Sequence, residues 1–304
     1  MKIYDMLIIG GGPGGYTAAL YAARAGLSAV VLEKLSAGGQ MALTTQIDNY
    51  PGFPEGIDGF TLGMQMQESA EKFGAETVIA EVESLELDSE IKTARTSEGD
   101  FFGRTVVFAT GAHHRELGVP GEKELAGRGV HYCAACDGFF YRDETVVVVG
   151  GGNSAAADAM ALSRIAKKVI LVHRRDTLRA TKVCHQPLME AENVVFQWNS
   201  TVSRLQADGR LTGVVIRDVN SGEEREISCD GLFVSIGRQP ATELVKGQLA
   251  LDEGGFVVAD ESTRTSLPGV FAVGDVRTKV LRQVVTAVAD GAAAAHRAEE
   301  YLLG

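Results

Sequence analysis

The most regular feature of the chain is a short apolar run that ends in glycines and leads into an alanine-rich segment. This pattern occurs at residues 6–9 (Met-Leu-Ile-Ile) and again at residues 146–149, which are four valines. The alanines that follow recur at helical spacing, and a further apolar run closes each copy. The helical segments and closing runs occupy residues 14–25, 29–32, 154–166 and 169–172. The pattern predicts a strand, a glycine-rich turn, a helix and a second strand, repeated once along the chain.

Both turns follow the G-x-G-x-x-G spacing of dinucleotide-binding sites. The matching positions are Gly10, Gly12 and Gly15 in the first copy and Gly150, Gly152 and Ala155 in the second. The first glycine allows the tight turn, the second lets a pyrophosphate approach the backbone, and the third lets helix and strand pack closely. A plain glycine-rich turn in a parallel sheet is the alternative. The strand before and the helix after each copy favour the dinucleotide site, with the phosphates at the positive end of the helix.

The residues at the ends of the two closing strands differ in charge. The first copy ends in Glu33, whose carboxylate suits a free ribose hydroxyl and would repel a phosphate. The second ends in His173, Arg174 and Arg175, with Arg179 nearby. Guanidinium groups there suit the 2′-phosphate of NADP(H), although a solvated basic turn is the alternative. Because two nicotinamide sites make little chemical sense, the first site is expected to bind FAD, as one flavin and one nicotinamide form an electron relay.

A third apolar run near the C-terminus completes the expected flavin site. Residues 270–273 are followed by Gly274 and Asp275, then by Arg282, Gln283 and an alanine-rich helix to about Leu302. The Asp275 carboxylate is placed to hold a ribitol hydroxyl, and the helix N-terminus would stabilise negative charge on a reduced ring. The alternative is an ordinary strand, loop and helix with a capping aspartate.

These elements predict one domain inserted into another. The runs 106–111 and 232–237 each resemble the last strand before the chain changes domain, and each is followed by a loop that contains a proline. The expected fold is α/β with two Rossmann-like domains in a three-layer ββα arrangement, the NADPH domain being inserted into the FAD domain. Its expected boundaries are 1–114 with 244–304 for FAD and 115–243 for NADPH. The segments 76–108 and 194–234 alternate strand-like runs with turns, and we expect them to form small antiparallel sheets that cover each domain.

Charge and length exclude several classes of protein. The 304 residues carry a net charge of −11 with no basic run, so no nucleic-acid partner is expected. No apolar stretch is long enough for a membrane helix, and the N-terminus lacks the pattern of a signal peptide. We therefore expect a cytoplasmic protein, in which a close cysteine pair is more often catalytic or metal-binding than structural.

Cys133 and Cys136 form such a pair, just before the second glycine-rich turn. Two intervening residues allow a reducible disulfide. A zinc site is the alternative, but it needs a second pair of ligands, and only Cys184-His185 and an isolated Cys229 remain. No metal is therefore expected. Asp137, directly after the pair, is placed to donate a proton to a leaving thiolate, and it equally suits the turn before the next glycine.

Over essentially its whole length the chain resembles the low-molecular-weight thioredoxin reductases of the bacterial and plant type. The placement of the cysteine pair inside the nicotinamide domain is the most specific part of the resemblance. The matching pieces are the two glycine motifs, Gly38-Gly39-Gln40, Asn49-Tyr50-Pro51-Gly52, Ala109-Thr110-Gly111-Ala112, Cys133-Ala-Ala-Cys136-Asp137-Gly138, His173-Arg174-Arg175-Asp176 with Arg179, and Gly274-Asp275-Val276 followed by Arg282-Gln283.

The resemblance implies that NADPH reduces FAD, that FAD reduces the Cys133–Cys136 disulfide, and that the dithiol reduces thioredoxin or a thioredoxin-like protein. It further implies that Cys136 faces the flavin, that Cys133 attacks the substrate disulfide, and that Asp137 supplies the proton. It also implies a homodimer, whose domains rotate on two strands near residues 113–118 and 240–246.

The resemblance and the glycine motifs together name the expected cofactor contacts. For FAD these are Gly10, Gly12, Pro13, Gly15, Glu33, Lys34, Gly39, Gln40, Asn49, Val82, Ala109, Thr110, Gly111, Gly274, Asp275, Arg282, Gln283 and Val284. For NADPH they are Gly150, Gly152, Asn153, Ser154, His173, Arg174, Arg175 and Arg179.

Two other functions are compatible with part of this pattern. A flavin-dependent dithiol oxidase would pass the electrons to oxygen, and it would not need Arg174, Arg175 and Arg179. A non-catalytic NADPH sensor would not need Cys133 and Cys136. The presence of both sets in one chain favours the reductase.

Overall fold

The computed structural model describes residues 2–304, and its internal contacts divide the chain into two compact units. Unit 1 comprises the residues up to His113 together with Gln239–Gly304, and unit 2 comprises His114–Arg238. Unit 2 is therefore inserted into unit 1 along the chain. Which dinucleotide each unit binds stays a prediction.

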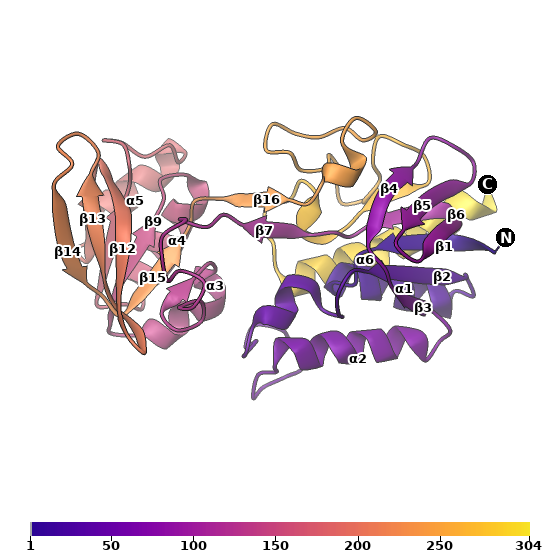
Figure 1. The fold of residues 1–304 in the computed structure, drawn as a ribbon, viewed down its shortest axis with the longest axis horizontal. Coiled ribbons are helices and arrows are strands. Elements are labelled where there is room, and N and C mark those ends of the chain that lie inside the picture. The colour runs from indigo at the N-terminus through magenta and orange to yellow at the C-terminus, as the bar shows by residue number, and fades with distance from the viewer. Residues whose placement is uncertain (1) are drawn as a thin grey trace. The chain divides into compact units, whose positions relative to one another are not determined.

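Unit 1 is built on a seven-stranded sheet (Figure 1). Its parallel part contains β3 (Glu76–Ile79), β2 (Ala29–Glu33), β1 (Ile3–Ile9), β6 (Gly99–Phe108) and β17 (Val270–Ala272), with β1 between β2 and β6. Strands β5 (Lys92–Thr96) and β4 (Val82–Glu86) extend it in the antiparallel sense beyond β6.

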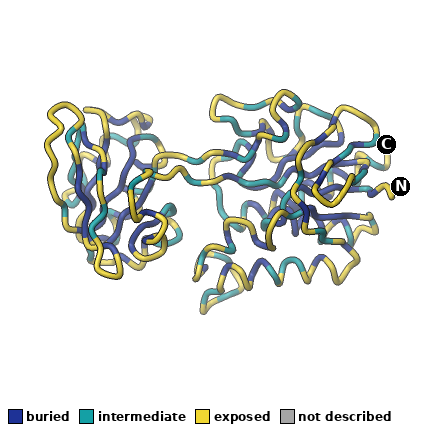
Figure 2. The backbone as a smooth tube through the Cα atoms, viewed as in Figure 1, coloured by how far each residue is buried: buried dark blue, intermediate teal, exposed yellow. Residues whose placement is uncertain are grey.

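Strand β1 shows why this sheet lies at the centre of its unit. Successive side chains of a strand point to opposite faces, and β1 is apolar on both. Met6 and Ile8 pack into the cluster that includes the helices, whereas Leu7 and Ile9 pack into the cluster that includes residues 245–259. Figure 2 shows the buried segments of the backbone in the interior and the exposed segments at the surface.

Helices α1 (Pro13–Arg24), α2 (Gly59–Glu71) and α6 (Val284–Leu303) cover the first of these faces. Helices α1 and α6 pack backbone against backbone. A Cβ atom on Gly291 of α6 would lie 2.2 Å from the Gly14 carbonyl oxygen of α1. Small residues such as Ala18, Ala294 and Ala298 line the same contact and are fully buried. This close approach fixes where the N-terminus of α6 lies relative to the first glycine-rich turn.

Unit 2 repeats the arrangement with a five-stranded parallel sheet. Its order is β11 (Val194–Gln197), β10 (Lys168–Val172), β9 (Thr145–Val149), β15 (Gly231–Val234) and β8 (Val130–His131). One face packs on the core that includes α4 (Asn153–Ser163) and α5 (His185–Glu190). The other packs against β12 (Ser200–Asp208), β13 (Arg210–Asp218) and β14 (Glu224–Ser228), which form a separate antiparallel sheet.

The expected α/β class with two Rossmann-like domains is confirmed, but the expected covering sheets are partly wrong. In the segment 76–108, β3 pairs parallel to β2, and β4 and β5 continue the main sheet rather than form their own. The reason is the length of β6, which pairs with β5 over Gly99–Gly103 and with β17 over Val106–Phe108. In the segment 194–234 only β12–β14 form a covering sheet, because β11 and β15 belong to the parallel one.

The end of one helix differs from the expectation. Helix α4 ends at Ser163 rather than at residue 166, because the N–H groups of Arg164 (3.3 Å) and Ile165 (3.0 Å) bond to carbonyls three residues earlier and tighten the last turn. The chain passes between the units through the paired strands β7 (Ala112–His114) and β16 (Arg238–Pro240), which follow the runs 106–111 and 232–237.

Over residues 2–304, no helix combines the length and the apolar character needed to cross a membrane.

The contact at Gly291 predicts that substitution by alanine destabilises the protein, whereas helix propensity alone would predict that it stabilises the protein. Alanine normally stabilises a helix by up to about 1 kcal/mol over glycine. Here Gly291→Ala should lower the free energy of unfolding by about 1–3 kcal/mol, because the new methyl group overlaps backbone atoms of α1. Urea denaturation of the variant and the parent protein measures the difference, and an equally or more stable variant would contradict this packing.

Candidate active site and dinucleotide cradles

The first glycine-rich turn joins β1 to α1, and two of its three motif glycines are required by the protein itself. A Cβ atom on Gly10, whose φ is +105°, would lie 2.6 Å from the Ala109 carbonyl oxygen. A Cβ atom on Gly15 would lie 2.0 Å from the Gly10 carbonyl oxygen. A Cβ atom on Gly12 would meet nothing within 4 Å. The space over Gly12, at the N-terminus of α1, therefore fits a ligand that must approach the backbone, as a pyrophosphate does.

The second turn, between β9 and α4, has the same division of roles. A Cβ atom on Gly150 would lie 2.3 Å from the Ser235 carbonyl oxygen, whereas one on Gly152 would meet nothing within 4 Å. Asn153, the first residue of α4, accepts a hydrogen bond from the Thr181 N–H (2.8 Å), and Ser154 is exposed beside it. Each unit thus contains one cradle of the same kind.

Glu33 lies at the end of β2, beside the first turn. Its carboxylate accepts hydrogen bonds from the N–H groups of Gly11 (2.7 Å) and Leu35 (3.0 Å). The backbone thus orients this side chain toward the glycine-rich turn, as expected for a ribose ligand. The neighbouring Lys34 instead forms an exposed ion pair with Glu81 (2.6 Å).

The other residues expected around FAD fall into three small groups. Asn49 donates a hydrogen bond to Gln283 (3.0 Å), although the two are far apart in the sequence. Gln40, in the 3-10 turn η1 (Gly39–Leu43), lies 3.2 Å from His113 Nδ1. Thr110 donates to the Ala241 carbonyl (2.7 Å), and Gly111 accepts from the Ala241 N–H (3.0 Å). Ala109 follows β6, and Val82 begins β4 as a half-buried residue.

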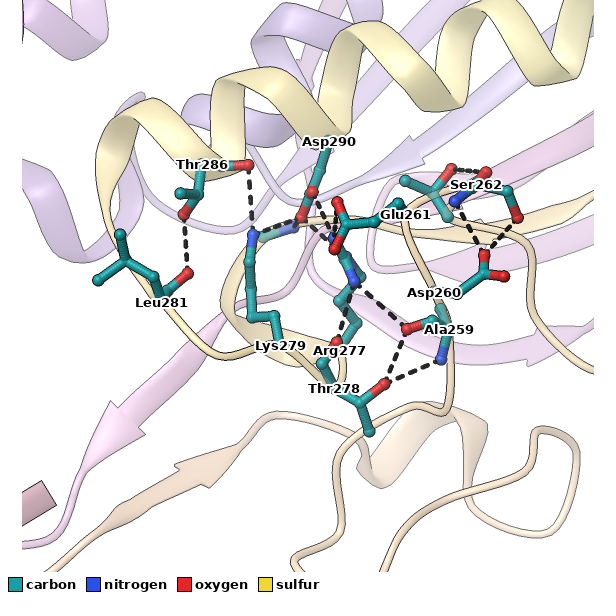
Figure 3. Close-up of polar contacts among 12 residues, drawn as sticks. Ala259, Asp260, Glu261, Ser262, Arg277, Thr278, Lys279, Leu281, Thr286 and Asp290 are labelled. Carbon is teal, nitrogen blue, oxygen red and sulfur yellow. Dashed lines mark hydrogen bonds and ion pairs between the residues drawn. The ribbon is translucent and has the colours of Figure 1, made fainter. Parts of the chain in front are cut away.

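The loop that carries Gly274 and Asp275 is held by a buried charge network (Figure 3). Asp290 of α6 accepts hydrogen bonds from the Gly274 N–H (2.8 Å), from Arg277 (2.7 and 2.9 Å) and from Lys279 (2.7 Å). Arg277 is 1% exposed and Asp290 is 5% exposed. Burial raises the pKa of Asp290, but the hydrogen bonds from Arg277 and Lys279 outweigh it and leave the pKa below its ordinary value.

The residues after this loop are positioned by α6 itself. Gln283 caps α6 through a reciprocal capping box with Thr286, and Val284 begins the helix. Arg282 donates to the carbonyls of Asp275 (3.3 Å) and Arg277 (3.2 Å), and its guanidinium lies 4.0 Å from the centre of the Phe256 ring. The sequence did not single out Arg277, Lys279 and Asp290. The signal available was one aspartate inside the apolar face of an alanine-rich helix.

The arginine cluster of unit 2 lies beside the second turn, but His173 does not lie with it. Arg174, Arg175 and Arg179 are exposed, and the Arg179 N–H donates to the Gly151 carbonyl (2.6 Å). His173 is 5% exposed, and its ring lies so close under Gly151 that a Cβ atom there would be 2.2 Å away. Burial and the three arginine charges lower the pKa of His173, which disfavours the cation. His173 therefore supports the turn, whereas the three arginines remain exposed beside it.

Cys133 and Cys136 form a disulfide at the start of the short helix α3 (Ala134–Asp137). Both are half-buried, and Asp137 closes the turn through its N–H to the Cys133 carbonyl (3.1 Å). The Asp137 carboxylate lies 3.2 Å from Nδ1 of the buried His131, whose Nε2 lies 2.6 Å from the Tyr141 hydroxyl. The sequence did not single out His131 or Tyr141.

The other two cysteines are free. Cys184 is half-buried, and Cys229 is buried, which raises its thiol pKa to about 12. Among residues 2–304 no three His, Cys, Asp or Glu side chains gather as a metal site would require.

Comparison with known proteins places this arrangement in a known group. The family model described as pyridine nucleotide-disulphide oxidoreductase matches residues 4–291. The chain is 48% identical to a thioredoxin reductase of Streptomyces clavuligerus, over 99% of this chain and 94% of that protein. It is 42% identical to a thioredoxin reductase of Treponema pallidum, over 98% and 97%.

Solved structures of thioredoxin reductases are also similar to this chain. A thioredoxin reductase from Streptococcus pyogenes superposes with a TM-score of 0.92 at 45% identity, covering 99% of this chain and 98% of that one. A thioredoxin reductase from Giardia duodenalis gives a TM-score of 0.94 at 35% identity, with full coverage of both chains.

Gly12 and Gly15 of the first turn predict different effects of substitution by alanine, one on flavin binding and the other on stability. Gly12→Ala should leave the free energy of unfolding of the flavin-free protein within about 0.5 kcal/mol of the parent, because its methyl group contacts nothing, yet it should reduce the bound flavin. Gly15→Ala should itself destabilise the protein by about 1–3 kcal/mol through the overlap with Gly10. Visible absorbance after purification measures flavin content, and urea denaturation after flavin removal measures stability. A Gly12→Ala protein with full flavin content would show that the cradle is misplaced.

The network of Figure 3 predicts a large stability effect from one charge. Asp290→Asn removes the buried counter-ion that Arg277 and Lys279 share and should lower the free energy of unfolding by about 3–5 kcal/mol. Glu261→Gln is the matched control, because Glu261 is 95% exposed and should contribute less than about 1 kcal/mol.

The same network has a defined pH dependence. Because the pKa of Asp290 is lowered in the folded protein, its stabilisation is present in full above the ordinary aspartate pKa. It is lost as the pH falls below that value. Chemical denaturation at neutral and acid pH should therefore show the difference between the parent protein and Asp290→Asn shrinking as the pH falls. A difference that stays constant at acid pH would contradict the charge network.

Proposed function

The chain belongs to the pyridine nucleotide-disulphide oxidoreductase family, and from this premise we propose that it reduces the disulfide of thioredoxin, or of a thioredoxin-like protein, with electrons from NADPH. The observation that carries the proposal is the Cys133–Cys136 disulfide in the same unit as the second glycine cradle and its arginines. A redox pair, a nicotinamide site and a flavin site in one chain form an electron path that ends at a protein disulfide. The named relatives, at 42–48% identity over nearly the whole chain, point to the same reaction.

The family implies a flavin and a pyridine nucleotide. The charged side chains beside the two glycine-rich turns differ in sign, and this difference indicates which turn binds which cofactor. In unit 1 the Glu33 carboxylate faces the turn, which favours the free ribose hydroxyl of FAD. Asn49, Gln283 and the loop at Asp275 belong to the same unit and supply polar groups for the rest of FAD. In unit 2 the exposed Arg174, Arg175 and Arg179 favour the 2′-phosphate of NADPH.

Bound FAD supplies a carrier that accepts a hydride from a nicotinamide and passes two electrons to a disulfide. The protein's own residues perform the rest. The Cys133–Cys136 pair stores one electron pair as a dithiol, and Cys133 attacks the disulfide of the partner protein. Cys136 then closes the disulfide and releases the reduced partner, while Asp137 moves the proton that the leaving thiolate requires.

The proposed enzyme acts in the cytoplasm as a homodimer. The free Cys184 and Cys229 and the reducible Cys133–Cys136 pair suit a reducing compartment, so the protein works in the cytoplasm. The active protein is a homodimer, as the resemblance to its family implies.

The proposal predicts a specific pattern of activity. Purified protein should be yellow and should reduce a thioredoxin with NADPH far faster than with NADH. Cys133→Ser should lose this activity, by more than about 100-fold, while NADPH still bleaches its flavin. Cys184→Ser is the matched control, because that thiol is free, and it should behave as the parent protein does.

Each failure has a separate meaning. If Cys133→Ser keeps full disulfide-reducing activity, the cysteine pair is not the exit for the electrons. If NADPH fails to bleach the flavin of the parent protein, the assignment of the electron donor is wrong.

A further inference from the structure

Three side chains form a continuous line beside the redox disulfide. The Asp137 carboxylate, one residue after Cys136, lies 3.2 Å from Nδ1 of His131, and His131 Nε2 lies 2.6 Å from the Tyr141 hydroxyl. His131 is 8% exposed and Tyr141 is 5% exposed. Both imidazole nitrogens therefore have one partner each, and one of these partners is the carboxylate that the proposed reaction uses as its acid.

The two rings are held by packing as well as by hydrogen bonds. The His131 ring stacks on Phe233 with centroids 5.3 Å apart, and Tyr141 meets the same phenylalanine edge-on at 5.4 Å. Gly231 makes room for Tyr141, because a Cβ atom there would lie 2.5 Å from the phenol ring. His131 ends β8, and Phe233 lies on the adjacent β15, so a central parallel sheet fixes the imidazole. A side chain held in this way can hold its partner in turn.

The protonation of Tyr141 determines which groups donate the hydrogen bonds that link Tyr141, His131 and Asp137. Burial raises the pKa of Tyr141 to about 12, and the carboxylates of Asp137, Glu144 and Asp230 add to this against the opposing charge of Arg210. The phenol thus keeps its proton and donates it to His131 Nε2. An imidazole that accepts this proton at Nε2 carries its own proton on Nδ1, from which it donates to the Asp137 carboxylate.

We propose that His131 is a positioning residue for thiol–disulfide exchange, which holds the Asp137 carboxyl group in one orientation beside the cysteine pair, and that Tyr141 selects the imidazole tautomer that does so. This inference rests on the proposed function and adds to it the reason why Asp137 is available in a fixed place. A carboxylate that is 22% exposed at the end of a four-residue helix has little else to orient it.

The step that depends on this orientation is balanced within the two proteins. The Cys133 thiol first gives its proton to the Asp137 carboxylate. The resulting Cys133 thiolate attacks one sulfur of the partner disulfide, so a mixed disulfide forms and the partner's other sulfur leaves as a thiolate. That thiolate takes a proton from Asp137. The Cys136 thiol gives its proton to the Asp137 carboxylate, attacks Cys133, and releases the partner's second sulfur, which is protonated in the same way. Two electrons and two protons pass from the protein dithiol to the partner.

The test separates the carboxylate, the imidazole and the phenol by single substitutions. Asp137→Asn sets the benchmark and should slow steady-state thioredoxin reduction by about 10- to 100-fold. His131→Leu removes both hydrogen bonds and should produce a similar loss. His131→Asn keeps an N–H near the place of Nδ1 and should recover activity to within about 3-fold of the parent protein. Tyr141→Phe keeps the ring and should lose about 3- to 10-fold.

Two controls distinguish positioning from folding. Stopped-flow bleaching of the flavin by NADPH does not involve Asp137 and should proceed at the parental rate in all four variants. His296→Leu replaces an exposed histidine that also faces carboxylates, those of Glu299 and Glu300, and should leave thioredoxin reduction unchanged.

The outcomes that overturn the inference are distinct from those that overturn the proposed function. If Asp137→Asn is slow but His131→Leu is as fast as the parent, the imidazole does not position the carboxylate. If His131→Asn is as slow as His131→Leu, or if His131→Leu also slows flavin bleaching, His131 serves the packing of unit 2 and no more. If Asp137→Asn has parental activity, both the positioning role and the acid role of Asp137 fall. If the parent protein itself does not reduce thioredoxin, it is the proposed function that fails.

Discussion

The contact between strand and helix backbone at the two glycine-rich turns is the constraint on which the rest of this structure depends. At Gly10 and Gly15 a methyl group would overlap a carbonyl oxygen, so the helix packs against the strand with no side chain between them. Gly12 and Gly152 are different, because nothing in the protein occupies the space next to their Cα atoms. The protein therefore uses the outer motif positions for its own packing and leaves the space over the middle glycine open. The same division in both units supports the proposal that each unit binds one dinucleotide.

The first turn also fixes the position of the other end of the proposed flavin site. Helix α6 packs on α1 so closely that Gly291 contacts the Gly14 carbonyl, and this places Asp290 below the Gly274 loop. The buried pair of Asp290 and Arg277 is costly to desolvate, and its effect is to hold that loop in one conformation. In unit 2 the Asp137–His131–Tyr141 line has a comparable role beside the disulfide. In both places the residue expected to meet the ligand or substrate depends on a buried partner.

Periodicity and spacing were enough to predict the two repeated units, because strands buried on both faces are continuously apolar and α1 and α4 follow their glycine motifs directly. They failed for β4 and β5, because sheet membership depends on which long strand is available as a partner, here β6. They also failed to predict the position of His173, because the sequence of a basic cluster does not show that the ring of one residue points inward and lies under Gly151. They also missed His131, Tyr141, Arg277 and Asp290, since those contacts join elements that only the folded chain brings together.

An anaerobic titration with NADPH tests the central claim, that the Cys133–Cys136 disulfide receives the electrons. One flavin and one disulfide accept two electron pairs, so bleaching of the flavin in the parent protein should need about two equivalents of NADPH per subunit. In the Cys133→Ser, Cys136→Ser double variant it should need about one, because only the flavin remains to be reduced. The same single-equivalent titration in both proteins would contradict the claim.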